Sequence, residues 1–207
     1  MLRIGSPKIF KMEDEVIREV RLRSGKLLMS AIVRTESHEC HDGTPSEEMK
    51  WLLVDRPDSV AVLIHDDAPD RDQIILVEQF RGSLKGNIFE LPAGSMEGGG
   101  GPADTAIREV WEEVKLKIKF LKEIGRFVMT PGTTPERIIL FYARVESLGP
   151  NGLISGLKSE NEDILKHVVD VEDAFAMMEA SDTRSRIIDA KTALALQWLK
   201  IQRLKKK

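Results

Sequence analysis

The stretch GSMEGGGGPADTAIREVWEEVKL, residues 94–116, decides the fold because a run of glycines leads directly into a helix. Pro102 suits the first turn of a helix, where its missing N–H is not needed. At about 100° per residue, one face of the helix is apolar. That face consists of Ala103, Ala106, Ile107, Val110 and Val114. The sequence therefore predicts an amphipathic helix that packs on a sheet.

Three glutamates, Glu109, Glu112 and Glu113, crowd this helix directly after Arg108. Like charges at helical spacing repel by roughly 0.2–0.5 kcal/mol per exposed pair. A solvated charged face would tolerate that repulsion. The strand, loop and helix order around 91–102 instead brings main-chain groups near the acidic face and favours a metal-bound pyrophosphate. Carboxylate oxygens suit Mg²⁺, or alternatively Mn²⁺, which bind one or two carboxylates together with substrate phosphate.

Around this helix the pattern indicates an α+β fold. Two strand-like runs flank Ser24-Gly25 and predict an N-terminal antiparallel hairpin. Further strands are expected at 59–64, 73–80, 87–91, 117–129, 137–145 and 164–170. A helix over 171–180 would follow Asp170 as its N-cap, and a last helix is expected over about 186–205. The buried stripe of that last helix is expected to be Ile187, Ala190, Leu194, Trp198 and Ile201.

Length and composition limit the classes of protein. The chain has 207 residues, and a polar, turn-rich stretch over 37–50 predicts an N-terminal subdomain, 1–50, and a main domain, 51–207. The net charge of -3 argues against general nucleic-acid binding. No apolar run approaches the ~20 residues that cross a bilayer, and the first twenty residues lack a signal-peptide core. Cys40 is the single cysteine, so we expect a cytoplasmic protein that binds neither membrane nor nucleic acid.

The helix and its glycine loop resemble the Nudix hydrolases, whose pattern is G-x5-E-x7-R-E-(apolar)-x-E-E-x-G-(apolar). Gly94 matches the first glycine, and 108–110, 112–113 and 116 match the core at the right spacing. Two positions depart from the pattern. Gly100 stands where the family has a glutamate, which alters the loop and can remove a partner of Arg108. Lys115 replaces a helix-ending glycine, so the helix is expected to end differently or run on.

Other segments are similar to ADP-ribose pyrophosphatases in the same order along the chain. They are VEQFR (77–81), FELPAGSME (89–97), TPGTTPERI (130–138), SENEDI (159–164) and ALALQWL (193–199). The resemblance implies a Nudix α/β/α sandwich around a mixed sheet, with an N-terminal antiparallel sheet. It also implies a homodimer that exchanges this N-terminal sheet.

The resemblance also implies roles for the acidic residues. Glu109 and Glu113 would be metal ligands, together with the main-chain carbonyl of Ala93. Glu112 would belong to the catalytic group, as a ligand or as a neighbour held through water. The segment 159–163 is similar to the loop that supplies the catalytic base, which makes Glu160 the base and Glu162 a further metal ligand. Without the resemblance, this segment reads as a plain acidic turn.

Substrate-binding candidates lie elsewhere in the chain. Arg81 ends a strand near the glycine loop, where it would either bind phosphate in a two-pronged way or form a structural ion pair. By resemblance, Arg56 would contact the adenine side of the substrate, from one subunit or the other. Glu136 would lie near the terminal ribose, with Gly132 and Thr133 shaping its loop. Phe10 and Trp51 could stack on a base, although packing in the core is the expectation for both.

Together these features predict a Mg²⁺-dependent hydrolase that acts on the pyrophosphate of a small-molecule nucleoside diphosphate sugar. With ADP-ribose the products would be AMP and ribose 5-phosphate. One alternative is a hydrolase of GDP-mannose or of a broader range of nucleoside diphosphate sugars. Another is a Nudix module that binds a nucleotide without catalysis, for which the departures at Gly100 and Lys115 are the only sequence support.

Overall fold

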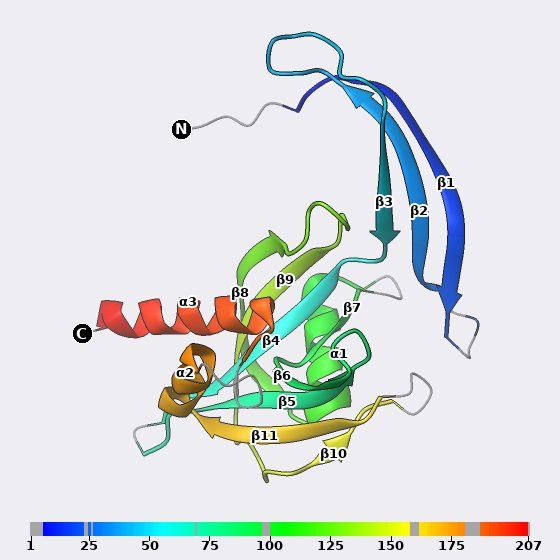
Figure 1. Ribbon diagram of the computed structural model, residues 1–207. Helices are drawn as coiled ribbons and strands as arrows, with labels where there is room; N and C mark the ends of the chain where they lie inside the picture. Colours follow the sequence, from blue (N-terminus) through cyan, green and yellow to red (C-terminus); the bar gives the residue numbers. More distant parts are fainter. Residues whose placement is uncertain are drawn as a thin grey trace. The chain divides into compact units, whose positions relative to one another are not determined.

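A computed structural model describes residues 6–22, 25, 27–68, 70–96, 100–157, 162–180 and 187–206 (Figure 1). The chain forms two compact units, and each is described by itself. The first unit comprises Met1–Arg56 and Thr130–Glu136. The second comprises Pro57–Met129 and Arg137–Lys207. Among the described residues, no helix has both the length and the apolar character needed to cross a membrane.

The first unit is built on a three-stranded antiparallel sheet in the order β1-β2-β3. Its strands are β1 (Ile9–Arg21), β2 (Leu27–His38) and β3 (Met49–Asp55). The expected hairpin around Ser24-Gly25 is therefore confirmed, and the sheet continues to Asp55. Phe10 and Trp51 are 44% and 40% exposed, so the expectation that they pack in a core is wrong. Both lie on strands of the three-stranded sheet, and among the described residues of this unit no second layer covers them.

The second unit contains a mixed sheet in the order β10-β11-β5-β4-β9-β8, with β6 added to β5 and β7 to β4. Only the β4–β9 pair is parallel among the strand pairs of the described residues. The strands are β4 (Ser59–Asp66), β5 (Gln73–Arg81), β6 (Gly86–Glu90), β7 (Ala93–Ser95), β8 (Ile118–Val128), β9 (Arg137–Val145), β10 (Ile154–Ser155) and β11 (Ile164–Asp170). The mixed sheet predicted from the family resemblance is confirmed.

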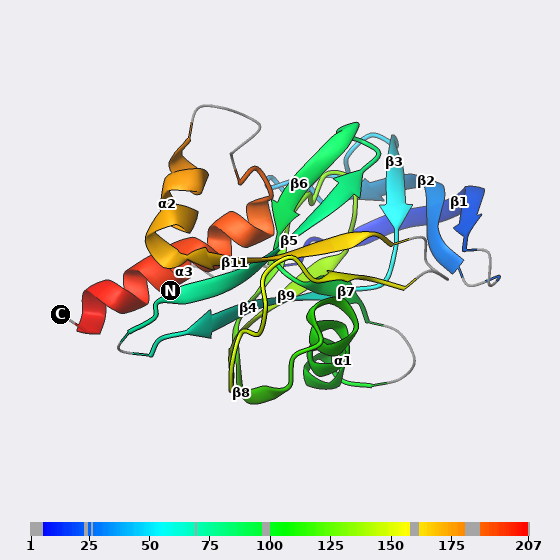
Figure 2. The same ribbon diagram turned by 90° about the horizontal axis from the view of Figure 1, so that it is seen from below.

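Helices cover both faces of this sheet, as Figure 2 shows. The helix α1 (Pro102–Val114) packs on one face, and α2 (Val171–Glu179) and α3 (Ala190–Lys206) pack on the other. The central strand β4 is buried on both sides because alternate residues point to opposite faces. Val62 contributes to the core under α1, and Leu63 contributes to the core under α3. This arrangement confirms the predicted α/β/α sandwich.

The last helix differs from the sequence-based expectation at its start. It begins at Ala190 rather than near 186, because the carboxylate of Asp189 accepts the N–H of Thr192 at 3.0 Å and caps the first turn. The start of α2 after Asp170 is as predicted. The Asp170 carboxylate, however, accepts a hydrogen bond from the Gln73 amide at 2.9 Å and makes no side-chain cap.

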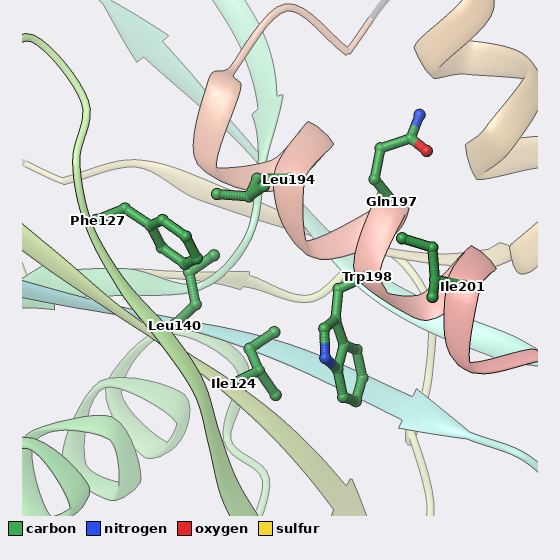
Figure 3. A pocket seen from close by; sticks show the side chains of 7 residues that line it. All are labelled: Ile124, Phe127, Leu140, Leu194, Gln197, Trp198 and Ile201. Atoms are coloured by element: carbon green, nitrogen blue, oxygen red, sulfur yellow. The ribbon is translucent and has the colours of Figure 1, made fainter. Parts of the chain in front are cut away.

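The buried face of α3 also differs from the expected stripe. Its fully buried residues are Thr192, Ala195, Leu196 and Leu199, whereas Ile201 is 49% exposed. Leu194, Trp198 and Ile201 instead line an apolar pocket of about 180 Å³ between α3 and the strands β8 and β9 (Figure 3). Its other lining residues are Ile124, Phe127, Leu140 and Gln197. Three of the five residues of the expected stripe therefore line a hollow beside the core.

Candidate active site

The helix α1 starts and stops at residues whose local chemistry explains its length. Pro102 occupies the first turn, as predicted, and the Asp104 carboxylate accepts the N–H of Gly101 at 3.2 Å. The helix ends at Val114 because Lys115 itself adopts the left-handed conformation, with φ 57° and ψ 35°. Its N–H donates to the carbonyl of Trp111 at 3.2 Å. The helix therefore stops at the residue that replaces the family's glycine, and it does not run on.

Two of the three helix glutamates are buried against the short strand β7. Glu109 is 8% exposed and Glu113 is 3% exposed. The main-chain N–H of Ala93 donates to Glu113 Oε2 at 3.2 Å. A Cβ atom at Gly94 would lie only 2.0 Å from Glu109 Cδ, so only glycine allows this approach. The matched glycine of the motif thus makes room for a matched glutamate.

Burial and repulsion between like charges destabilise the charged forms of Glu109 and Glu113. Burial raises the pKa of Glu109 to about 7, in spite of the opposing charge of Arg108. Burial also raises the pKa of Glu113 well above its usual range, and repulsion from Glu109 and Glu162 adds to the rise. The Ala93 N–H and the charge of Arg81 counter it only in part. Hard oxygen donors that repel one another in a buried place fit a divalent cation.

Arg108 organises the third glutamate. Its Nη1 atom pairs with Glu112 Oε2 at 2.7 Å, and its Nη2 atom pairs with Glu109 Oε1 at 2.6 Å. The same Nη2 atom donates to the carbonyl of Ser95 at 3.3 Å. Arg108 therefore ties Glu109 and Glu112 to β7, although Gly100 provides no carboxylate to orient it.

Glu162 lies close enough to the two buried glutamates for its charge to add to the rise that burial causes in the pKa of each. The Leu157 N–H donates to Glu162 Oε2 at 3.0 Å. The Ser155 hydroxyl donates to the main-chain carbonyl of Glu113 and so joins β10 to α1. Glu160, the expected base, lies outside the described residues. Within the described ranges, no three His, Cys, Asp or Glu side chains already form a metal-binding group.

The sequence left two roles open for Arg81, phosphate binding or a structural ion pair, and the structure shows the ion pair. Its Nε and Nη2 atoms pair with the two carboxylate oxygens of Glu90 at 2.6 and 2.8 Å. Lys191 Nζ also contacts Glu90 Oε2 at 2.5 Å. Burial by itself raises the pKa of the Glu90 carboxyl. The two cations more than offset that rise and lower this pKa to about 2. Arg81 remains 41% exposed in its side chain, so its predicted role in binding phosphate stays a prediction.

Sequence reasoning missed Glu90 and Lys191. Glu90 stands in the otherwise apolar run Ile88-Phe89-Glu90-Leu91, which is the one signal that a buried charge needs a partner there. Lys191 is 101 residues away, and nothing in the sequence connects the two.

The first unit contains four of the substrate-binding candidates, namely Arg56, Gly132, Thr133 and Glu136. Arg56 follows β3, and its Nε atom lies 3.4 Å from Glu136 Oε2. That Nε atom is buried and makes no hydrogen bond with any described residue. The loop 130–136 is joined to β3 because the Val54 N–H donates to the carbonyl of Thr133 at 2.8 Å. Gly132 lies exposed in the same loop.

The fold and this acidic helix define a class of hydrolase, and comparison with known proteins identifies it. Residues 55–190 match the NUDIX domain. The chain therefore belongs to the Nudix family, which confirms the resemblance and the predicted class of pyrophosphohydrolase.

Individual relatives give a narrower view. The chain is 33% identical over 193 residues to an ADP-ribose pyrophosphatase of Bacillus subtilis (strain 168), covering 92% of this chain and 95% of that protein. It is 34% identical over 169 residues to an ADP-ribose pyrophosphatase of Escherichia coli (strain K12), covering 79% and 78%. The crystal structure of an ADP compounds hydrolase matches with a TM-score of 0.64 at 20% identity, over 98% of each chain. This last likeness shows the fold.

Proposed function

We propose that this protein is a Mg²⁺-dependent hydrolase that cleaves the pyrophosphate of ADP-ribose to give AMP and ribose 5-phosphate. The observation that carries the proposal is the pair of buried, mutually repelling carboxylates of Glu109 and Glu113 against the β7 backbone. A cation that relieves this repulsion also neutralises a diphosphate. The choice of ADP-ribose rests on the relatives named ADP-ribose pyrophosphatase.

Each acidic residue has a part in this proposal. Glu109, Glu113 and Glu162 would hold the metal through carboxylate oxygens, and Ala93 through its main-chain carbonyl. When bound, the metal would neutralise the diphosphate and lower the pKa of the attacking water. Glu160 would accept the proton of that water as general base. Glu112 would keep Arg108 in place at the edge of the site, as its 2.7 Å ion pair supports.

Arg81 would bind the diphosphate. Its Nε and Nη2 atoms are engaged by Glu90, whereas no described residue accepts a hydrogen bond from its Nη1 atom. Arg81 also stands close enough to Glu113 for its charge to oppose the rise that burial causes in the Glu113 pKa. A guanidinium fixed in this way presents a donor to a phosphate oxygen beside the metal ligands.

Two parts of the substrate would be recognised by residues of the first unit. Arg56 would contact the adenine side, and Glu136 would accept hydrogen bonds from the hydroxyls of the terminal ribose. Gly132 and Thr133 would shape the loop that carries Glu136. The buried Arg56 Nε atom faces Glu136 Oε2 at 3.4 Å without forming a hydrogen bond, and a ligand that accepted its N–H would supply one, which supports a ligand role.

We further propose a cytoplasmic homodimer that exchanges its N-terminal sheet. The strand β1 exposes an unusual number of apolar side chains, namely Ile9, Phe10, Met12, Val16, Ile17 and Val20. A partner subunit would cover them. The single cysteine, Cys40, suits a reducing compartment. Sedimentation equilibrium at micromolar concentration tests the dimer, and a monomer would contradict it.

The decisive test is hydrolysis of a substrate panel with Mg²⁺, Mn²⁺ or no added metal. The panel contains ADP-ribose, GDP-mannose, a UDP-sugar, diadenosine polyphosphate and a nucleoside triphosphate. We expect metal-dependent release of two monophosphates, fastest from ADP-ribose. Faster cleavage of GDP-mannose would support metal-dependent pyrophosphate hydrolysis but contradict ADP-ribose as the preferred substrate. Nucleotide binding without turnover of any compound would contradict the proposed hydrolysis.

A further inference from the structure

The first turn of α3 reaches the end of β6, just before the segment Leu91–Ala93. Thr192 is fully buried, and its hydroxyl accepts the main-chain N–H of Leu91 at 2.9 Å. The same hydroxyl donates to Asp189 Oδ2 at 2.5 Å. Asp189 thus caps the helix and orients the Thr192 hydroxyl at the same time. Leu91 precedes Ala93 by two residues, so this hydrogen bond fixes the segment that carries the Ala93 carbonyl.

The neighbouring residue of the same turn acts on a different part of the site. Lys191 Nζ lies between Glu90 Oε2 at 2.5 Å and Asp189 Oδ1 at 2.9 Å. Its side chain is 12% exposed and that of Glu90 is 3% exposed, so the pair is shielded from water. Glu90 in turn holds the Arg81 guanidinium by two hydrogen bonds, one to each carboxylate oxygen. A displaced Glu90 would therefore turn the guanidinium as well.

We infer that the first turn of α3 is a positioning element with two separable outputs. Lys191 sets the orientation of Arg81 through Glu90, and Thr192 sets the Leu91–Ala93 segment that faces the metal. Each acts through another residue, Lys191 through Glu90 and Thr192 through the main chain of Leu91, so both are positioning residues. The inference rests on the proposed function, because it assigns phosphate binding to Arg81 and a metal contact to Ala93.

The two outputs are tested by Lys191→Met and Thr192→Val in the full chain. For Lys191→Met, we expect the KM for ADP-ribose to rise about tenfold with kcat nearly unchanged, since substrate is gripped less well. For Thr192→Val, calorimetric titration should show that Mn²⁺ binds about tenfold more weakly. This is the lower end of the loss of metal affinity that follows when a residue supporting the metal ligands is removed. Lys191→Met should leave the Mn²⁺ affinity unchanged.

Three variants serve as controls. Lys191→Arg and Thr192→Ser keep the charge and the hydroxyl, and both should restore wild-type behaviour. Lys200→Met removes a salt bridge from the same helix, between Lys200 and Glu179 at 2.9 Å, and should change neither readout. Circular dichroism and thermal melting confirm that each variant is folded.

The outcomes separate the inference from the proposed function. An active wild type with unchanged Lys191→Met and Thr192→Val variants would overturn the inference alone. Equal changes in KM and in Mn²⁺ affinity for both variants would also overturn it, because they would indicate a general loosening. A wild type inactive on every substrate would overturn the proposed function, while the Mn²⁺ titration would still test the Thr192 output.

Discussion

Replacing Gly94 with alanine tests whether the close approach of β7 to Glu109 is needed for activity. A Cβ atom at position 94 would lie 2.0 Å from Glu109 Cδ and Oε1 and 2.4 Å from Oε2. Ordinary contact begins at 3.4 Å, so the groups must separate by the difference, about 1.4 Å.

The carboxylate is the group that must move. Gly94 is paired with Val60 on β4, a strand buried over nearly its whole length, so the β7 backbone is held in place. The α1 backbone is anchored in the core by Ala106 and Val110. A misplacement of about 1 Å can reduce catalysis roughly 100-fold, which corresponds to about 2.7 kcal/mol of lost transition-state stabilisation.

The assay is kcat/KM for ADP-ribose at saturating Mg²⁺, with Mn²⁺ affinity measured in parallel. Gly82→Ala is the matched control, since a Cβ there meets nothing within 4 Å and should leave activity unchanged. If Gly94→Ala retained activity within about threefold of the wild type, the assignment of Glu109 as a placed metal ligand would be wrong.

Three further predictions concern single side chains. Glu113→Gln should reduce metal-dependent turnover at least about 100-fold, since a neutral amide is a poor ligand for a hard cation. Circular dichroism should show that the fold is intact. Wild-type rates would contradict the assignment of Glu113 as a metal ligand. Lys115→Gly should raise the free energy of unfolding in urea by about 1 kcal/mol at unchanged activity, because φ is 57° there; a loss of stability would mean that the Lys115 side chain matters more than its backbone strain. The Glu90 pKa of about 2 is lower than its usual 4.5, so its charged form stabilises the fold above pH 4.5, and that contribution is lost as the pH falls toward 2. The stability difference between wild type and Glu90→Gln, measured by urea unfolding from pH 6 to 3, should therefore shrink below pH 4.5, and a constant difference would contradict the ion pair.

The predictions from sequence succeeded where structure is local and failed where it depends on packing. The helix over 102–114 was predictable because both of its signals, Pro102 and an apolar stripe with helical period, lie within one short continuous segment. The buried face of α3 was not, because AKTALALQWLKIQRL carries apolar residues on more than one side and only the sheet beneath selects among them. The helix glutamates could be found from spacing for the same local reason. The Glu90–Lys191 pair could not, since it joins residues that only the tertiary fold brings together.

The hydrogen bond between Leu91 and Thr192 has a consequence for how the protein folds. It closes a loop of 101 residues, and the Glu90–Lys191 contact spans an equal separation. Contacts between such distant segments form slowly because the entropy of closing the loop must be overcome first. We therefore expect refolding in two observable stages, with α1 and the β8–β9 hairpin, whose contacts are local, gaining protection from hydrogen exchange before the Leu91 amide does. Competence to bind the metal should appear only with the second stage.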